Sequence, residues 1–234
     1  MSKTDTATGK QRDLTEGSIA KTMLLFALPT LGSSALQSLN GSINAVWVGR
    51  FLGEEALAAT ANGNILMFIL ISFVFGFGMA ATILIGQAMG RRDDTMVKKT
   101  MGTALGSIIP ISVLVAAVGW IFAPTLLDLL GTPPSAVSLA LTYMRMIFIA
   151  MPVTLTFTML MMALRGTGDS TTPLWFIIMS VVIDLVLTPT LILGLGPFPE
   201  WGIFGSAFAT AVANTLALIG MIVTMYLRGS VLAL

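Results

Sequence analysis

The sequence predicts an all-α membrane protein, a bundle of six transmembrane helices. Of the 234 residues, 56% are hydrophobic and only 10% are charged, whereas a soluble protein has about 25% charged residues. Apolar segments of the roughly 20 residues that a helix needs to cross a bilayer recur along the chain. Short segments rich in Gly, Pro, Asp and Ser separate them, as is typical of connections between helices.

The composition also excludes several classes of function. The chain contains no cysteine and no histidine, so disulfides, thiolate or histidine zinc sites and Ser-His catalysis are impossible within it. Its 12 basic and 11 acidic residues nearly cancel, which gives no indication of nucleic-acid binding. There is no nucleotide-binding motif. We therefore expect neither enzymatic activity nor a cofactor.

The chain divides into three parts. A polar tail of mixed charge occupies residues 1–18, a transmembrane lobe is predicted at residues 19–228, and residues 229–234 start a cytoplasmic linker or form a C-terminal tail. Because the connections are short, neighbouring helices are expected to be antiparallel. The predicted spans are approximately 20–48, 55–88, 99–122, 137–163, 173–194 and 202–227.

The first span carries a polar stripe within the sequence "SSALQSLNGSIN". At about 100° per residue, Ser33, Gln37, Asn40 and Asn44 fall on one narrow face of the helix. Such a face can line a water-filled cavity, or it can form hydrogen bonds to neighbouring helices. Contact between this stripe and an intramembrane acid would favour the first interpretation.

The second and third spans are joined by "GRRDD", with connections of the type "GRFLGEE" and "LLGTPPS" before and after them. The second span is longer than a crossing requires, so its start at Glu54 can be a non-spanning helix. Ten of the 12 Lys and Arg residues fall on one side of a six-span arrangement, which predicts that this side is cytoplasmic. Both termini are expected to face the cytoplasm, with the chain integral to a bacterial-type cell (inner) membrane and in contact with its lipids.

The fourth span is rich in methionine, with six between Met144 and Met162. Methionine surfaces adapt to varied apolar ligands, and they are also ordinary core residues. Arg145 lies near the start of this span and is the one basic residue that we expect in a cavity.

The fifth span contains Asp184 in the apolar run "SVVIDLVLTP". An Asp at the centre of a membrane helix costs on the order of 2.5–3.5 kcal/mol to insert, and such residues commonly mark ion or proton paths. Thr188 lies one turn further on the same face, where its hydroxyl can bond the carboxylate. Pro189 can expose backbone carbonyls near them. The alternative is a structural Asp paired with a neighbouring helix.

The sixth span has two features. Gly205, Ala209 and Ala213 have the spacing of small residues that allows close helix packing. Thr210 and Asn214 lie one turn apart, and we assign this pair mainly to packing, with Asn214 also a candidate for the cavity face.

Several stretches of the sequence together resemble one family. They are "FALPTLGSSALQSLNGSINAVWVGRFLGEEALAA", "IGQAMGRRD", "ALRGTGDSTTP", "DLVLTPTLILGLG" and "WGIFGSAFAT". In this order they resemble the N-terminal six-helix lobe of a MATE (multidrug and toxic compound extrusion) transporter, from about Leu14 to the C-terminus. Members of that family are twelve-helix antiporters built from two lobes, which export cationic or amphipathic organic compounds in exchange for H⁺ or Na⁺.

The resemblance implies positions for the coupling site. In one bacterial branch, an Asp in the first helix and an Asn-x-x-x-Asp pair in the fifth bind the coupling ion. The corresponding residues of this chain are Asn44, Asp184 and Thr188, so a single acid remains, at which Na⁺ or a proton can bind. The residues expected to face the substrate are Gln37, Asn40, Asn44 and Asn214.

The chain has about half the length of a family member. We expect it to be a fragment, or a half-size transporter in which a second copy replaces the second lobe. Small organic cations or amphipathic drugs are the expected substrates. Two alternatives remain open: a lipid-linked carrier flippase of the same superfamily, and a non-transporting membrane assembly module.

Overall fold

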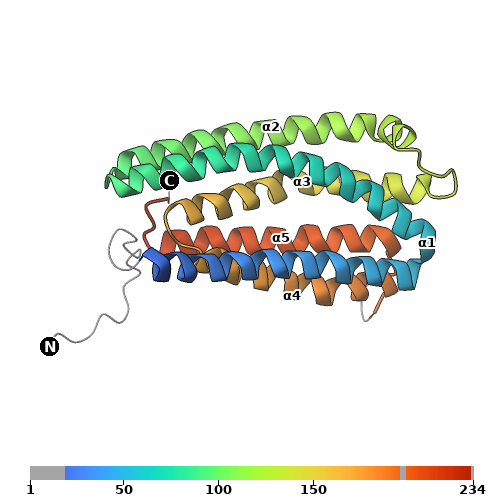
Figure 1. Cartoon of the computed structure of the whole chain (residues 1–234). Coiled ribbons are helices and arrows are strands. Elements are labelled where there is room, and N and C mark those ends of the chain that lie inside the picture. The colour runs from blue at the N-terminus through green and yellow to red at the C-terminus, as the bar shows by residue number, and fades with distance from the viewer. Residues whose placement is uncertain (1–18, 196–198, 233–234) are drawn as a thin grey trace.

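The computed structural model describes residues 19–195 and 199–232, and this part of the chain is a bundle of long helices without strands (Figure 1). All five described helices are long and apolar enough to cross a membrane. Their bounds are α1 Ile19–Gly90, α2 Asp94–Leu129, α3 Val137–Gly166, α4 Thr171–Leu193 and α5 Gly202–Leu227.

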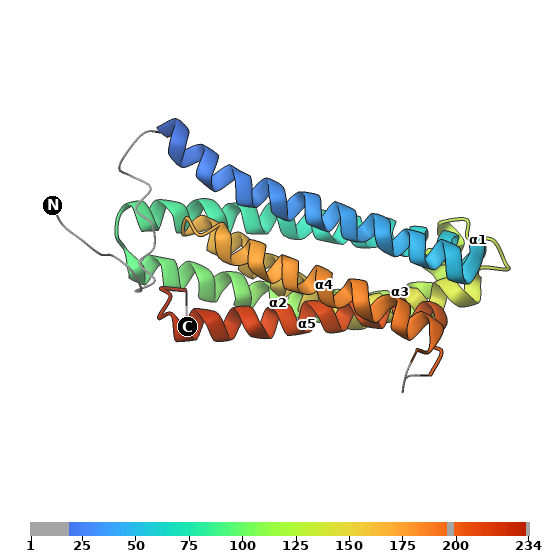
Figure 2. The same ribbon diagram turned by 90° about the horizontal axis from the view of Figure 1, so that it is seen from below.

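The first helix is bent back on itself at Gly53. This residue has φ 85° and ψ −175°, outside the helical region, and it divides α1 into a first arm, residues 19–52, and a second arm, residues 54–90. Only glycine adopts this conformation without strain. Figure 1 and Figure 2 show the two arms meeting at one end of the bundle and diverging towards the other end. The predicted spans 20–48 and 55–88 lie on these arms. The chain turns within the predicted connection "GRFLGEE", where every residue except Gly53 is helical.

Short connections join the other helices at residues 91–93, 130–136 and 167–170. Asp93 caps α2, since its Oδ1 accepts a hydrogen bond from the backbone N–H of Met96 at 2.9 Å. Asp169, which precedes the N-cap residue of α4, likewise binds its first turn, accepting from the backbone N–H of Thr172 at 2.9 Å. These hydrogen bonds satisfy backbone donors that a helix start leaves free.

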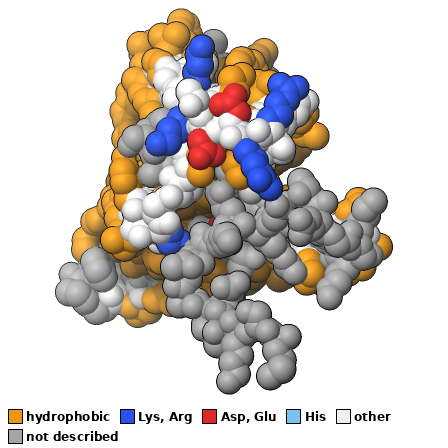
Figure 3. All heavy atoms as spheres, turned by 90° about the vertical axis from the view of Figure 1, so that its left-hand side faces the viewer, with side chains coloured by type: hydrophobic (Ala, Val, Ile, Leu, Met, Phe, Trp, Pro, Cys, Tyr) orange, Lys and Arg blue, Asp and Glu red, His pale blue; other side chains and the backbone are white. Residues whose placement is uncertain are grey.

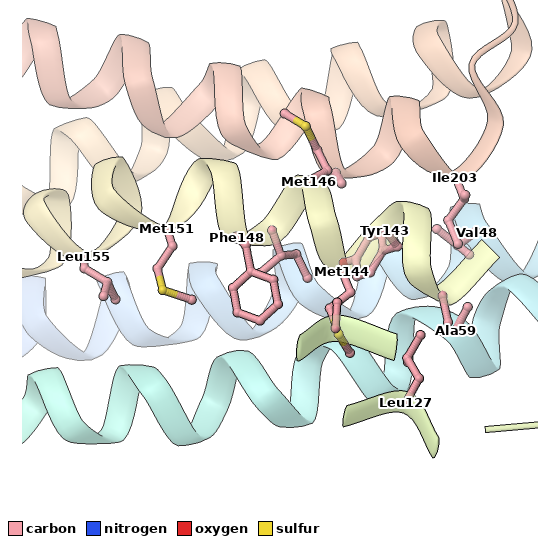
Figure 4. Packing of buried hydrophobic residues seen from close by; sticks show 14 of the residues in the cluster. Val48, Ala59, Leu127, Tyr143, Met144, Met146, Phe148, Met151, Leu155 and Ile203 are labelled. Carbon is pink, nitrogen blue, oxygen red and sulfur yellow. The ribbon is translucent and has the colours of Figure 1, made fainter. Parts of the chain in front are cut away.

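The third helix lies at the centre of the bundle and packs against α1, α2 and α5. Phe148 and Met144 extend from α3 into the buried hydrophobic cluster (Figure 4). The ring of Phe148 occupies the space that a side chain at Gly119 of α2 would need. All six methionines of the methionine-rich segment are buried, and two of them, Met161 and Met162, also line the cavity described below.

The fourth and fifth helices approach each other closely. A Cβ added to Gly205 would lie 2.9 Å from the carbonyl oxygen of Leu191, so only glycine fits at this crossing. Gly205, Ala209 and Ala213 are all buried, as expected from their spacing. The close crossing holds α4 and α5 in register, which positions the polar side chains described below.

Charged side chains gather at one end of the bundle, which we call the charged end (Figure 3). It includes the α1–α2 connection, with exposed Arg91 and Arg92, and the first turns of α2, with exposed Lys98 and Lys99. The start of α1 and the end of α5 lie at the same end (Figure 1). Hydrophobic side chains cover the visible flanks of the bundle (Figure 3).

Candidate functional site

A cavity of about 300 Å³ lies inside the bundle, between both arms of α1 and helices α3, α4 and α5. Each of these helices contributes polar side chains to its wall. Tyr143 and Arg165 both line it from α3, and they are about 33 Å apart along a helix axis at 1.5 Å per residue. The cavity is therefore elongated along the bundle.

A buried carboxylate lies directly behind the wall of the cavity. Asp184 of α4 is only 3% exposed. Its Oδ2 accepts a hydrogen bond from the Nδ2 of Asn40 at 2.8 Å. Its Oδ1 accepts from the Oγ1 of Thr188 at 3.1 Å and from the Oγ1 of Thr210 at 3.0 Å. Three helices, α1, α4 and α5, thus converge on one acid.

Asp184 lies behind two of its own partners. Asn40 and Thr210 both line the cavity, and each donates to a different oxygen of the carboxylate. A cation that reaches Asp184 from the cavity has to pass between them or displace one of their hydrogen bonds. The oxygen atoms that could bind a cation here are those of one carboxylate and of the hydroxyl groups of Thr188 and Thr210. Such a site fits a proton or a monovalent cation better than a divalent cation, which takes more oxygen ligands.

Three members of the polar stripe on α1 line the cavity: Gln37, Asn40 and Asn44. Asn44 accepts a hydrogen bond at its Oδ1 from the Oγ of Ser206 in α5 at 2.9 Å. The fourth member, Ser33, is buried and donates to the carbonyl of Pro29 in its own helix. Asn40 is thus the member of the stripe that contacts Asp184.

Asn214 of α5 also lines the cavity. It accepts from the Oγ of Ser180 in α4 at 3.0 Å and donates to the Oγ1 of Thr154 in α3 at 3.3 Å. This chain of hydrogen bonds crosses the bundle beside Asp184. The candidate residues Asp184, Thr188, Asn40 and Asn214 therefore belong to one polar region.

Sequence reasoning missed several residues of this region. Thr210 was assigned with Asn214 to packing between helices, but it bonds Asp184. The spacing of Thr210 and Asn214 on one face of α5 was the available signal. Ser180 and Thr154 gave no signal, because single hydroxyls are common in membrane helices and their partners lie on other helices.

The predicted cavity base is wrong. The guanidinium of Arg145 lies 5.3 Å from the ring centroid of Trp120 in α2, on the far side of α3 from the α4–α5 pair. Arg165, which follows the fourth predicted span 137–163, lines the cavity instead. Both residues are on α3, and a prediction of depth alone does not give the direction in which each side chain leaves the helix.

A family model and comparisons with known proteins find the same family. The MatE family model matches residues 29–190. Probable multidrug resistance protein YoeA of Bacillus subtilis (strain 168) is 41% identical over 211 residues, which are 90% of this chain and 45% of that protein. Probable multidrug resistance protein YpnP of the same organism is 32% identical over 208 residues, 89% of this chain and 46% of that protein.

A solved structure shows the same fold. The outward-facing conformation of a multidrug resistance MATE family transporter of the MOP superfamily matches with a TM-score of 0.87 at 21% identity, covering 98% of this chain and 50% of that one. The chain thus spans about half the length of the relatives that it matches.

Proposed function

Since the chain belongs to the MatE family and is an integral membrane protein, we propose that it forms one lobe of a secondary antiporter. The antiporter exports cationic or amphipathic organic compounds in exchange for H⁺ or Na⁺. A second six-helix lobe, or a second copy of this chain, completes it. Both termini face the cytoplasm, on the side of the charged end of the bundle.

The observation that carries this proposal is the position of Asp184. A carboxylate that is buried beside a polar cavity and held by three side-chain donors from three helices has the environment of an ion-responsive group. Cation binding to Asp184 competes with the hydrogen bonds from Asn40 and Thr210. Loading the site therefore changes the contacts between α1, α4 and α5, which couples ion binding to the shape of the cavity.

Two other functions are less well supported. One observation, the basic residue Arg165 in the cavity wall, favours a lipid-linked carrier flippase. Preferential binding of undecaprenyl phosphate over an organic cation would identify this function. A non-transporting assembly module does not account for a polar cavity of about 300 Å³. The named relatives are multidrug resistance proteins rather than enzymes, which favours transport over catalysis.

Transport in proteoliposomes tests the proposal. The wild-type chain is expected to move the cationic dye rhodamine 123 when a proton or sodium gradient is imposed, and Asp184→Asn is expected to abolish the movement while leaving the helix content unchanged. Ser42→Ala is the control, because Ser42 is exposed and bonds only within α1. Wild-type rates in a well-folded Asp184→Asn protein would exclude the coupling role.

The oligomeric state of the chain has to be known before the transport result can be interpreted. Native mass spectrometry of the chain in lipid nanodiscs is expected to show a dimer if a second copy replaces the second lobe. A monomer without flux would indicate that a different second lobe is required. The two readouts together separate the role of Asp184 from the question of what completes the transporter.

A further inference from the structure

Arg165 presents unpaired hydrogen-bond donors in the cavity. Its Nε and Nη2 atoms are buried and have no hydrogen-bond partner among the described residues, and its side chain lines the cavity. Buried charged groups are normally paired, because an unpaired guanidinium in an apolar environment is costly. Arg165 is also the one formally charged residue among the described residues of the cavity lining.

The backbone that carries Arg165 is held firmly in place. The Oγ1 of Thr82 in the second arm of α1 donates to the carbonyl of Met162 at 2.9 Å. A Cβ at Gly166 would lie 2.9 Å from the carbonyl oxygen of Thr82, so the two helices touch backbone to backbone beside Arg165. This end of α3 therefore has little freedom to carry the guanidinium to another partner.

Asp169, four residues along the chain from Arg165, and Asp184, behind the cavity wall, already have other hydrogen-bond partners. Asp169 accepts at Oδ1 from the backbone N–H groups of Thr171 and Thr172, and at Oδ2 from the hydroxyl of Thr172. Asp184 accepts from three neutral side chains. Among the described residues, no salt bridge to Arg165 satisfies its charge.

We infer that Arg165 forms an anion-binding subsite at the charged end of the cavity, which takes a carboxylate or phosphate group on an amphipathic molecule. The guanidinium offers a planar fork that pairs with either group through two hydrogen bonds. Phe157, Met161 and Met162 of α3 also line the cavity and supply apolar surface for the rest of the molecule. This inference rests on the proposed function, since it assigns part of the substrate to the same cavity.

The inference extends the range of substrates. An organic cation with a second, anionic group places its positive charge near Asp184, which lies behind Asn40 and Thr210 of the cavity wall, and its anionic group at Arg165. A purely cationic compound meets the unpaired guanidinium without compensation. Zwitterionic and anionic amphipaths are therefore expected to bind better than cations of the same shape.

Two dyes of nearly the same shape test this preference. Rhodamine 110 carries a free carboxylate, and rhodamine 123 is its methyl ester. Their equilibrium binding to the full chain in phosphatidylcholine nanodiscs is measured by fluorescence anisotropy, without any ion gradient. The wild-type chain is expected to favour rhodamine 110 by about tenfold or more, as a charge-assisted pair should provide.

The variants separate charge recognition from folding. Arg165→Gln is expected to remove the preference while rhodamine 123 still binds, and Arg165→Lys is expected to keep part of it. Arg145→Gln is the matched control, because Arg145 also has a buried, unpartnered Nε but stacks on Trp120 outside the cavity lining. It is expected to keep the wild-type preference.

Two results would overturn the subsite. If rhodamine 123 binds and rhodamine 110 gains no advantage, or if Arg165→Gln and Arg165→Lys both keep the wild-type preference, Arg165 does not recognise the anion. Failure of both dyes to bind would overturn the proposed function as well. The two levels of failure are thus distinguishable, because the dye preference is read at equilibrium and the Asp184 test is read as ion-driven flux.

The source of the anionic group is identified by lipid composition. If phosphatidylglycerol in the nanodiscs competes with rhodamine 110 in the wild-type chain but not in Arg165→Gln, a lipid headgroup supplies the anion. If phosphatidylglycerol leaves the dye affinity unchanged, a soluble amphipath supplies it. Each outcome supports the same chemistry at Arg165.

Discussion

The side-chain amide of Asn40 donates a 2.8 Å hydrogen bond to Oδ2 of Asp184, across 144 positions of the sequence. Asn40 lines the cavity, whereas Asp184 is almost completely buried behind it. The first arm of α1 thereby closes one side of the carboxylate and Thr210 of α5 closes the other. Under the proposed function, access of the coupling cation to Asp184 depends on these two contacts.

Removal of the Asn40 side chain is expected to expose Asp184. The small side chain of Asn40→Ala leaves Oδ2 without its donor and opens a path from the cavity. Labelling of Asp184 by dicyclohexylcarbodiimide, followed by peptide mass spectrometry, is expected to rise several-fold. Ser42→Ala, on the exposed side of the same helix, should label as the wild type does, and equal labelling in both variants would show that Asn40 does not limit access.

Loss of a hydroxyl donor to Asp184 is expected to destabilise the bundle. Thr210→Val and Thr188→Val each keep the side-chain shape and remove one hydrogen bond to a carboxylate, worth about 1.5–3 kcal/mol. Each variant should therefore melt a few degrees lower in detergent. Thr215→Val is the control, because Thr215 bonds only the carbonyl of Ala211 in its own helix. A control that loses as much stability would mean that the effect is not specific to Asp184.

The crossing of α4 and α5 is expected to tolerate no side chain at Gly205. The added Cβ of Gly205→Ala would lie 2.9 Å from the backbone of Leu191, so the helices must separate and the contact of Thr210 with Asp184 must weaken. We expect lower thermal stability and weaker rhodamine 123 binding. Gly106→Ala has open space around its Cβ and should be neutral or slightly stabilising. The account of this crossing fails if both substitutions are equally tolerated.

The bend in α1 is expected to depend on Gly53 for conformational reasons alone. A Cβ at Gly53 meets no atom within 4 Å, but the residue has φ 85°. Gly53→Ala should therefore cost roughly 1–3 kcal/mol in backbone strain, measured as a lower melting temperature and lower yield of folded protein. Gly76→Ala, in a helical position with open space, should show no such loss.

The sequence allowed prediction of the polar groups that are costly in a membrane. Asp184 and the stripe of Gln37, Asn40 and Asn44 could be found because a polar side chain in an apolar helix stands out by composition and spacing. Their partners could not be found in this way. The hydrogen bonds from Thr210 and Ser206 depend on how α5 is rotated against α1 and α4, and the close contact of Gly205 with Leu191 sets that rotation.

The two arginines of α3 show the same limit. Arg145 and Arg165 differ in direction around the helix rather than in residue type, and α2 covers one side of α3 while the cavity lies on another. A connection at "GRFLGEE" could be predicted from its composition, but not that Gly53 alone would interrupt the helix. For the two arginines, the missing information was the relative placement of helices that are distant in sequence.

The most direct test of the coupling role of Asp184 is the dependence of rhodamine 123 affinity on pH and on Na⁺ concentration, in the wild-type chain and in Asp184→Asn. If the coupling cation and the substrate compete through Asp184, the wild-type affinity changes with at least one of the two cations and the Asp184→Asn affinity changes with neither. An Asp184→Asn protein that keeps the wild-type dependence would contradict the assignment of Asp184 as the ion-responsive group.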